Sequence, residues 1–186
     1  MDRFCEEREK NIMEETRGLE EFRLPRWREL PSMPLYLEQV LALLEEWLGP
    51  YLSHGTGKVM TRTMINNYVK QRFISPPSGR RYDRMTVASL FAIAVLKPVY
   101  TMEEIGYLIR LSVGHSDTEA AYDGFCDCAE KAVRCAFQGT VMPKESDPGD
   151  PRQLLWNACN AFACQLYVRR TYLEDALATG KEKADG

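Results

Sequence analysis

The segment Ile74–Tyr82, with the sequence ISPPSGRRY, constrains the fold of this chain more than any other part of it. Two adjacent prolines fix their own backbone angles and remove two amide donors, so neither a helix nor a central strand can run through them. Gly79 follows at once, and this combination is typical of a tight extended loop or a small hairpin. Helical patterns lie on both sides, so the segment must connect two helices.

Periodicity predicts helices on the N-terminal side of that segment. Apolar residues recur at spacings of three and four over residues 35–48, and Gly49-Pro50 is expected to end this helix. A second helix is predicted over residues 61–72, with Thr61 or Thr63 as its N-cap.

Further helices are predicted after the Pro-Pro segment. Asp83 is the expected N-cap of an apolar helix that runs to Lys97, and the capping box TMEE, from Thr101, begins the next helix. Amphipathic patterns then predict two longer helices over about residues 116–137 and 152–178, joined by the loop GTVMPKESDPGDP.

These elements divide the chain into four parts. We expect a charged N-terminal helical arm over residues 1–23, a headpiece over residues 24–112, a helical region over residues 113–180 and a disordered tail over residues 181–186. With 186 residues, 45% of them apolar, the chain is long enough to bury a core. The predicted fold class is therefore mainly α.

Residues 24–34, LPRWRELPSMP, contain three prolines around Trp27 and are predicted to be extended. Trp27 has a large apolar ring with one polar N–H, which suits a side chain that packs such a segment against the body of the protein. The alternative is a short aromatic motif that binds a partner.

Positive charge is concentrated in the predicted helix 61–72 and in the loop after it. Residues 55–84 contain seven basic side chains and one acidic side chain, for a net charge of +6, whereas residues 1–54 and 85–186 carry net charges of −5 and −4. Neutralised phosphates release counterions and supply affinity for any nucleic-acid sequence, so a basic island suits a phosphate-binding surface. Double-stranded DNA is therefore the expected partner.

The predicted helix 61–72 has one apolar and one polar face. The apolar face consists of Ile65, Tyr68, Val69 and Phe73, and the polar face of Thr63, Asn66, Asn67 and Lys70. Asparagine reads adenine in the major groove, while threonine and lysine reach phosphate or guanine. Arginines of the loop 76–82 would contact the backbone or the adjacent minor groove. The predicted DNA-contacting residues are Arg62, Thr63, Asn66, Asn67, Lys70, Arg80, Arg81 and Tyr82.

The alternative is that these polar side chains form a solvated surface without a partner. Helix interiors mildly disfavour asparagine, so two adjacent asparagines favour a functional interpretation of the face.

The order of helix, turn, helix, basic loop and helix resembles the winged helix-turn-helix of MerR-type regulators. The matching segments are MTRTMINNY from Met60, FISP from Phe73, RRY from Arg80 and YTMEEIGYLI from Tyr100. The chain resembles still more closely a bacterial family of domains of unknown function with MerR-like headpieces. This resemblance rests on LPRW, TMINNYVK, the Pro-Pro loop that ends in Tyr82, and Leu96-Lys97.

The resemblance covers about residues 24–109. It implies a MerR-like winged helix-turn-helix domain over residues 24–112, with the loop 76–82 as its wing, followed by an α-helical C-terminal region. It also implies a DNA-binding transcriptional regulator, without supplying a target sequence.

A single headpiece of this size would bind DNA weakly, and such readers usually place two copies on half-sites about one helical turn apart. We therefore expect a homodimer that pairs through the helices of residues 113–180. That region is rich in aromatic side chains, which form either a packed bundle core or a pocket for an unknown small-molecule effector. The residues concerned are Tyr122, Phe125, Phe137, Trp156, Phe162 and Tyr167.

Other function classes have little support in the sequence. There is no nucleophile elbow, phosphate loop or set of paired metal ligands, so we predict neither an enzyme nor a cofactor. Cys126 and Cys128 lie on different faces of a predicted helix, and the cysteines are expected to be small core residues, with a metal site near His115 as the alternative. No apolar run is long enough to span a bilayer, and the charged, acidic N-terminus differs from a secretory signal, which predicts a cytoplasmic protein.

One alternative to DNA binding stays open. The chain would then be a protein-interaction adaptor that keeps the headpiece as a scaffold and binds a partner through the C-terminal helices or through the LPRW segment.

Overall fold

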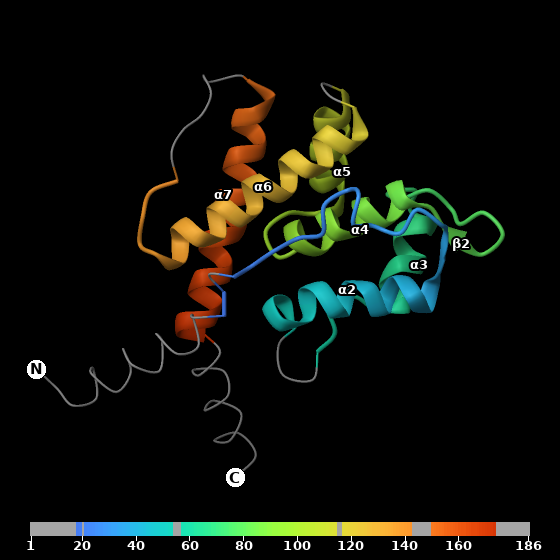
Figure 1. The fold of residues 1–186 in the computed structure, drawn as a ribbon, viewed down its shortest axis with the longest axis horizontal. Helices are drawn as coiled ribbons and strands as arrows, with labels where there is room; N and C mark the ends of the chain where they lie inside the picture. Colours follow the sequence, from blue (N-terminus) through green and yellow to red (C-terminus); the bar gives the residue numbers. More distant parts are fainter. Residues whose placement is uncertain (1–17, 20, 54–56, 115–116, 143–149, 174–186) are drawn as a thin grey trace, which may run out of the picture.

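The structure is a computed structural model that describes residues 18–19, 21–53, 57–114, 117–142 and 150–173 (Figure 1). Within these ranges the chain forms six α-helices and one two-stranded sheet, so the predicted mainly α-helical fold is confirmed. The elements are β1 (Leu35–Tyr36), α2 (Leu37–Leu52), α3 (Arg62–Lys70), β2 (Arg81–Tyr82), α4 (Arg84–Leu96), α5 (Met102–Gly114), α6 (Thr118–Phe137) and α7 (Pro151–Val168). A π-helical turn, Arg169–Leu173, continues α7.

Helix α4 lies at the centre of the molecule. It is apolar all round, which is typical of a helix that is covered on every side, and α2, α5, α6 and α7 all pack against it. Its N-cap is Asp83, whose carboxylate accepts a hydrogen bond of 2.8 Å from the amide of Thr86, as predicted. Thr101 and Glu104 exchange the two hydrogen bonds of the predicted capping box before α5.

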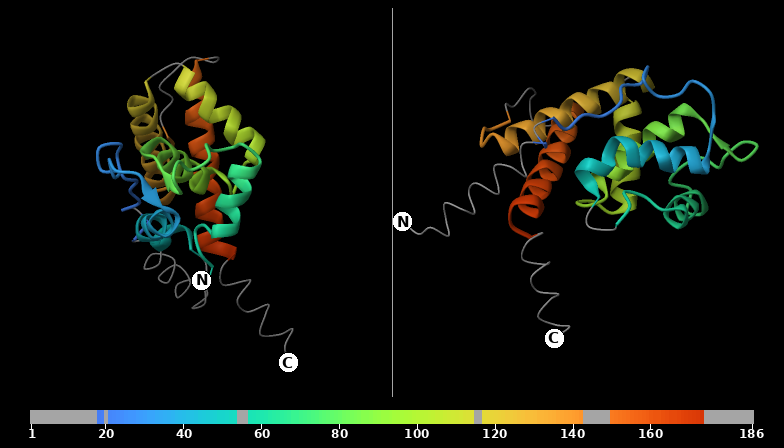
Figure 2. Two further views of the ribbon diagram at one scale, coloured as in Figure 1. Left: turned by 90° about the vertical axis from the view of Figure 1, so that its right-hand side faces the viewer. Right: turned by 60° about the horizontal axis from the view of Figure 1, so that its bottom comes forward.

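Helices α6 and α7 form the most extensive helix pair. In Figure 1 they lie at the other end of the molecule from β2. The right-hand view of Figure 2 shows the same separation. The apolar stripe predicted for α7 packs inward, with Ala158, Cys159, Phe162 and Leu166 buried. The predicted arm and tail fall mostly on residues 1–17 and 174–186, which lie outside the described residues.

The predicted end of the first helix at Gly49-Pro50 is wrong, because α2 continues to Leu52. Proline removes one helical hydrogen bond, but tertiary contacts stabilise the extra turn. Arg170 donates to the carbonyl oxygens of Pro50 (3.3 Å) and Tyr51 (2.7 Å). The ring of Tyr51 also packs edge to face on Phe22, with ring centroids 5.1 Å apart.

The prediction that residues 24–34 are extended is correct only in part, because residues 27–29 form a turn in which the amide of Glu29 donates to the carbonyl of Arg26 (2.9 Å). The LPRW segment runs along α6 and joins the two ends of the molecule. Arg26 forms a two-pronged pair with Glu130, with N–O distances of 2.6 and 2.8 Å, and the amide of Leu24 donates to the same carboxylate (2.8 Å). The backbone amide of Trp27 donates to Asp123 (2.7 Å). The acids on α6 therefore hold this segment through both its side chains and its backbone.

The ring of Trp27 packs on Tyr122 of α6, with centroids 6.3 Å apart. On the headpiece side, the guanidinium of Arg84 lies 5.6 Å from the centroid of the Trp27 ring. Trp27 thus contacts both α4 and α6, which confirms its predicted packing role.

Candidate nucleic-acid interface

Helix α3 is fixed at its start by the side chain of Thr61, whose hydroxyl accepts a hydrogen bond of 3.3 Å from the amide of Met64. Ile65 is fully buried and Tyr68 is 8% exposed, so these two side chains anchor the helix to the core. Burial also raises the pKa of the Tyr68 hydroxyl.

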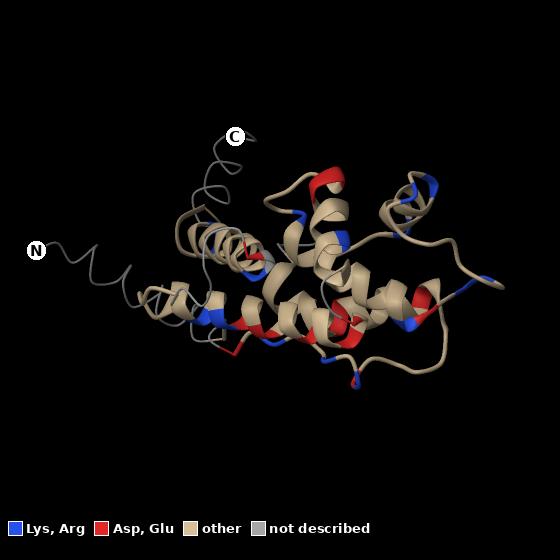
Figure 3. Ribbon diagram, turned by 90° about the horizontal axis from the view of Figure 1, so that it is seen from above, with Lys and Arg blue, Asp and Glu red and all other residues tan. Residues whose placement is uncertain are grey.

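The opposite face of α3 is exposed. It presents Thr63, Asn66, Asn67 and Lys70 together, and α3 contains no acidic residue. Figure 3 shows blue and no red along this helix. The side chains on this face are hydrogen-bond donors and acceptors with one positive charge, which is the chemistry that base edges and phosphates accept.

The C-terminus of α3 ends in a Schellman turn. The amide of Phe73 donates to the carbonyl of Tyr68 (2.9 Å), and the amide of Arg72 donates to that of Val69 (3.0 Å). Arg72 has a φ of 62°, at a position that glycine usually occupies. The helix therefore spans Arg62–Lys70 instead of the predicted 61–72, and a second exposed cation lies just beyond its end.

The predicted wing is a tight turn beside a very short sheet. Ser78 and Arg81 exchange two backbone hydrogen bonds of 3.0 Å each. The central residues Gly79 and Arg80 have φ values of 55° and 65°, both positive as a type I′ turn requires. Strand β2 then pairs antiparallel with β1, which comes from before α2, with Leu35 opposite Tyr82. Arg80 is exposed at the tip of the turn.

Arg81 is held against Tyr36, its partner across the sheet. The guanidinium lies 4.7 Å from the centroid of the Tyr36 ring and donates to its hydroxyl (2.8 Å). This stacking leaves Arg81 exposed but limits its rotamers. The guanidinium is therefore oriented for anion binding before an anion arrives.

Two predicted contact residues have other partners. Tyr82 is only 4% exposed and packs in the core opposite Leu35, so it anchors β2 and does not join the exposed set. Burial raises the pKa of its hydroxyl. Arg62 is exposed but forms an ion pair with Glu38 of α2, which offsets part of its charge. The remaining predicted residues, Thr63, Asn66, Asn67, Lys70, Arg80 and Arg81, are all exposed.

The segment that leads into α3 is held from two helices. The ammonium of Lys97, at the end of α4, donates to the carbonyl oxygen of Val59, and Glu45 of α2 accepts from the amide of Val59 (3.1 Å). The sequence marks Lys97 only as the end of the apolar helix and as part of the Leu-Lys resemblance, and it assigns no role to Glu45, a polar residue within an amphipathic helix. These contacts fix where α3 begins.

The cysteines follow their predicted core role in part, because Cys128 and Cys135 are half-buried and Cys164 is exposed. Cys126 and Cys159 are fully buried, and none of the five cysteines of the described residues forms a disulfide. Burial raises the pKa of the Cys126 thiol to about 12. Among the residues that the structure describes, no three His, Cys, Asp or Glu side chains are grouped as metal ligands.

Residues 25–125 match the family described as a domain of unknown function, DUF1836. The chain belongs to this family. The DUF1836 match extends from the LPRW segment to the middle of α6, so it includes α3, the loop 76–82 and Lys97. No curated protein and no solved structure matches the chain significantly. None of the helices in the described part of this DUF1836 protein combines the length and apolarity needed to cross a bilayer.

Proposed function

We propose that this DUF1836 protein is a DNA-binding transcriptional regulator. Helix α3 would enter the major groove, and the wing, residues 76–82, would contact the neighbouring backbone. The observation that carries the proposal is the acid-free polar face of α3, exposed beside an arginine-tipped turn. The described parts of α6 and α7 leave this face uncovered.

The residues divide into two roles. Asn66 and Asn67 project from the middle of the exposed face and would read base edges, with adenine as the preferred partner of each carboxamide. Lys70, Arg80 and Arg81 would bind phosphates and set the register without sequence preference.

Two residues in strained conformations support this division. Arg72 and Arg80 are the non-glycine residues with positive φ in the described part of the chain, and both are exposed arginines at the candidate interface. A left-handed backbone costs a side chain about 1–3 kcal/mol, and such strain clusters at binding sites. Glycine at either position would adopt this backbone conformation without strain. We therefore propose that arginine stands there because its guanidinium group is needed for binding.

The element order α2, turn, α3, hairpin and α4 supports a MerR-like winged helix-turn-helix. A regulator of this kind would act in the cytoplasm as a homodimer, because two headpieces on two half-sites multiply both affinity and specificity. The apolar side chains of Val168, Tyr172 and Leu173 are exposed at the end of α7 and its π-turn, and they offer a surface for pairing.

The same apolar surface favours the second candidate, a protein-interaction adaptor. Its other proposed docking point, LPRW, has its backbone and side chains engaged with α6 within the chain. The adaptor would therefore bind through the end of α7.

Selection of genomic fragments on the purified protein, followed by affinity measurements at two salt concentrations, tests the DNA proposal. We expect a preferred fragment whose association constant falls steeply with salt, by about 0.9 logarithmic units per tenfold salt increase for each phosphate contacted. A chain that retains no fragment, or binds without any salt dependence, contradicts it. The adaptor instead predicts a protein partner that survives nuclease treatment and is lost on Tyr172→Ser substitution.

A further inference from the structure

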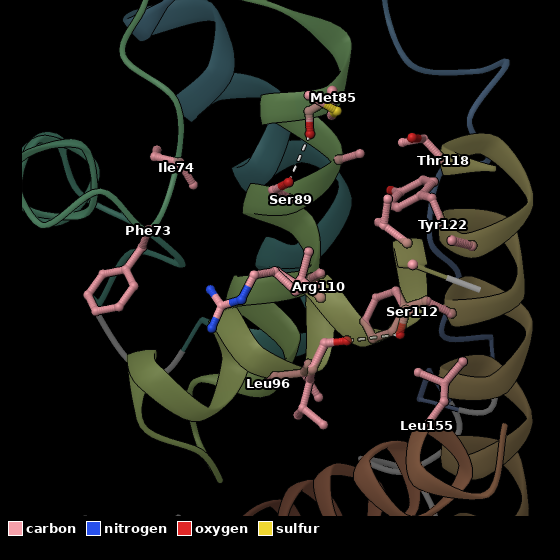
Figure 4. A pocket seen from close by; sticks show the side chains of 18 of the residues that line it. Phe73, Ile74, Met85, Ser89, Leu96, Arg110, Ser112, Thr118, Tyr122 and Leu155 are labelled. Carbon is pink, nitrogen blue, oxygen red and sulfur yellow. Dashed lines mark hydrogen bonds between the residues drawn. The ribbon is translucent and has the colours of Figure 1, made fainter. Parts of the chain in front are cut away.

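A cavity of about 480 Å³ lies between the headpiece and the C-terminal helices (Figure 4). Its walls come from α4, α5, α6 and α7 and from the segment that follows α3. Of the aromatic residues considered for an effector pocket, Tyr122 and Phe125 line it. Phe73, whose amide closes the Schellman turn of α3, and Ile74, the next residue, form another wall.

The volume falls in the range of roughly 300–1,000 Å³ that is usual for small-molecule sites. It is too small for a docked domain but sufficient for a molecule with a short hydrocarbon or aromatic body.

The walls are mainly apolar, and two of their hydroxyl groups are engaged within their own helices, whereas the Tyr122 hydroxyl is buried without a hydrogen-bond partner in the described structure. Ser89 donates to the carbonyl of Met85 (3.0 Å), and Ser112 donates to that of Leu108 (3.0 Å), both within their own helices. Figure 4 draws both bonds as dashed lines. The body of a ligand would therefore gain affinity by removing apolar surface from water.

One charged side chain stands at the cavity. Among the described lining residues, Arg110 of α5 is the one charged residue, so no acidic side chain lines the walls. Arg110 forms no ion pair with another described residue. In Figure 4 its guanidinium points toward the space beside Phe73. A methyl group on Gly106 would lie 3.3 Å from a guanidinium nitrogen and 3.7 Å from the Phe73 ring, so Gly106 leaves room for this conformation.

We propose that this cavity binds a small monocarboxylate with an apolar body, such as a medium-chain fatty acid or an aromatic acid. The carboxylate would pair with Arg110, since guanidinium–carboxylate bonds are charge-assisted and can be bidentate. The apolar body would lie against Leu155, Phe125 and the other apolar walls. The inference concerns binding alone and does not rest on the DNA proposal.

The direct test is calorimetric titration of the full chain with decanoate, and with decan-1-ol as the neutral molecule of the same chain length. We expect about one decanoate per chain and a melting temperature that rises with decanoate concentration. Arg110→Gln should weaken decanoate binding about tenfold, as the loss of one charge-assisted contact predicts, and should leave decan-1-ol binding unchanged.

The matched control is Ser89→Leu, which fills the cavity at a half-buried position and should weaken both probes. Circular dichroism melts verify that both variants fold. The proposal is overturned if decanoate does not bind, or if it binds Arg110→Gln or Ser89→Leu as tightly as the natural chain. It is also overturned if sedimentation shows a dimer that Ser89→Leu dissociates, because a second copy would then occupy the cavity. Failure of DNA binding leaves all of these readouts unaffected.

Discussion

The ammonium group of Lys97 donates a hydrogen bond to the carbonyl oxygen of Val59, two residues before the N-cap of α3. Glu45 binds the amide of the same residue, so α4 and α2 together fix the point where α3 starts. The Lys97 side chain is half-buried, and this burial lowers the pKa of its ammonium group. Lys97, which lies 38 residues after Val59 in the sequence, thus helps to set the position of the candidate recognition helix α3.

Replacement of this lysine should destabilise the protein. Lys97→Met keeps the apolar stem but leaves the Val59 carbonyl without its donor, and we expect a loss of about 1–3 kcal/mol in the free energy of unfolding, measured by urea titration. Lys70→Met is the control, because Lys70 is exposed and its loss should leave stability unchanged within about 0.5 kcal/mol. Equal stability of the two variants would contradict the positioning role of Lys97.

The LPRW segment should depend on one carboxylate more than on its neighbour. Glu130 accepts from Arg26 and from the amide of Leu24, and its side chain is 12% exposed, whereas Asp127 also pairs with Arg26 but is 72% exposed. We expect Glu130→Ala to cost about 2–4 kcal/mol and Asp127→Ala less than about 1 kcal/mol in thermal unfolding. Similar costs for both variants would mean that the segment is held mainly by apolar packing.

The turn tip offers a test that separates charge from folding. Arg80→Gly removes the guanidinium but suits the left-handed backbone, so the fold should be unaffected or slightly more stable. DNA affinity should fall alike on every sequence, and the salt slope should decrease by about one. Arg80→Lys, which keeps the charge, should retain that slope. Unchanged DNA binding by Arg80→Gly would remove the turn from the interface.

Release of Arg62 should strengthen DNA binding. Because Glu38 pairs with Arg62, Glu38→Gln leaves the guanidinium available to a phosphate. We expect DNA affinity to rise about two- to fivefold at low salt, which corresponds to a gain of less than about 1 kcal/mol in binding free energy. Glu46→Gln removes an equal charge from the same helix and controls for net charge. Fluorescence anisotropy on the selected fragment measures both, and equal effects would show that only net charge matters.

Local chemistry made much of the fold predictable. Thr61, Asp83 and Thr101 cap their helices as expected, because a capping side chain bonds to an amide only two or three residues away. Long-range contacts were not predictable: the pairing of Leu35 with Tyr82 joins two strands of two residues, too short to carry a pattern. The extension of α2 past Pro50 likewise depends on Arg170, far along the chain.

The candidate site divides in the same way. The exposed face of α3 follows from helical period alone, since Asn66 and Asn67 lie opposite the buried Ile65 and Tyr68. The burial of Tyr82 depends on which way β2 faces once it pairs with β1, and the Arg62–Glu38 pair depends on how α2 crosses α3. The sequence indicates the cavity beside Arg110 only through aromatic residues, of which Tyr122 and Phe125 line it, because separate helices form its walls.

The most direct test of the account compares the specificity of the natural chain with that of the double variant Asn66→Ala, Asn67→Ala. The quantity to measure is the ratio of affinities for the selected fragment and for a scrambled duplex of equal length and composition. We predict that this ratio falls about 10- to 100-fold in the double variant while affinity for the scrambled duplex stays the same. An unchanged ratio in a folded variant would show that α3 does not read DNA.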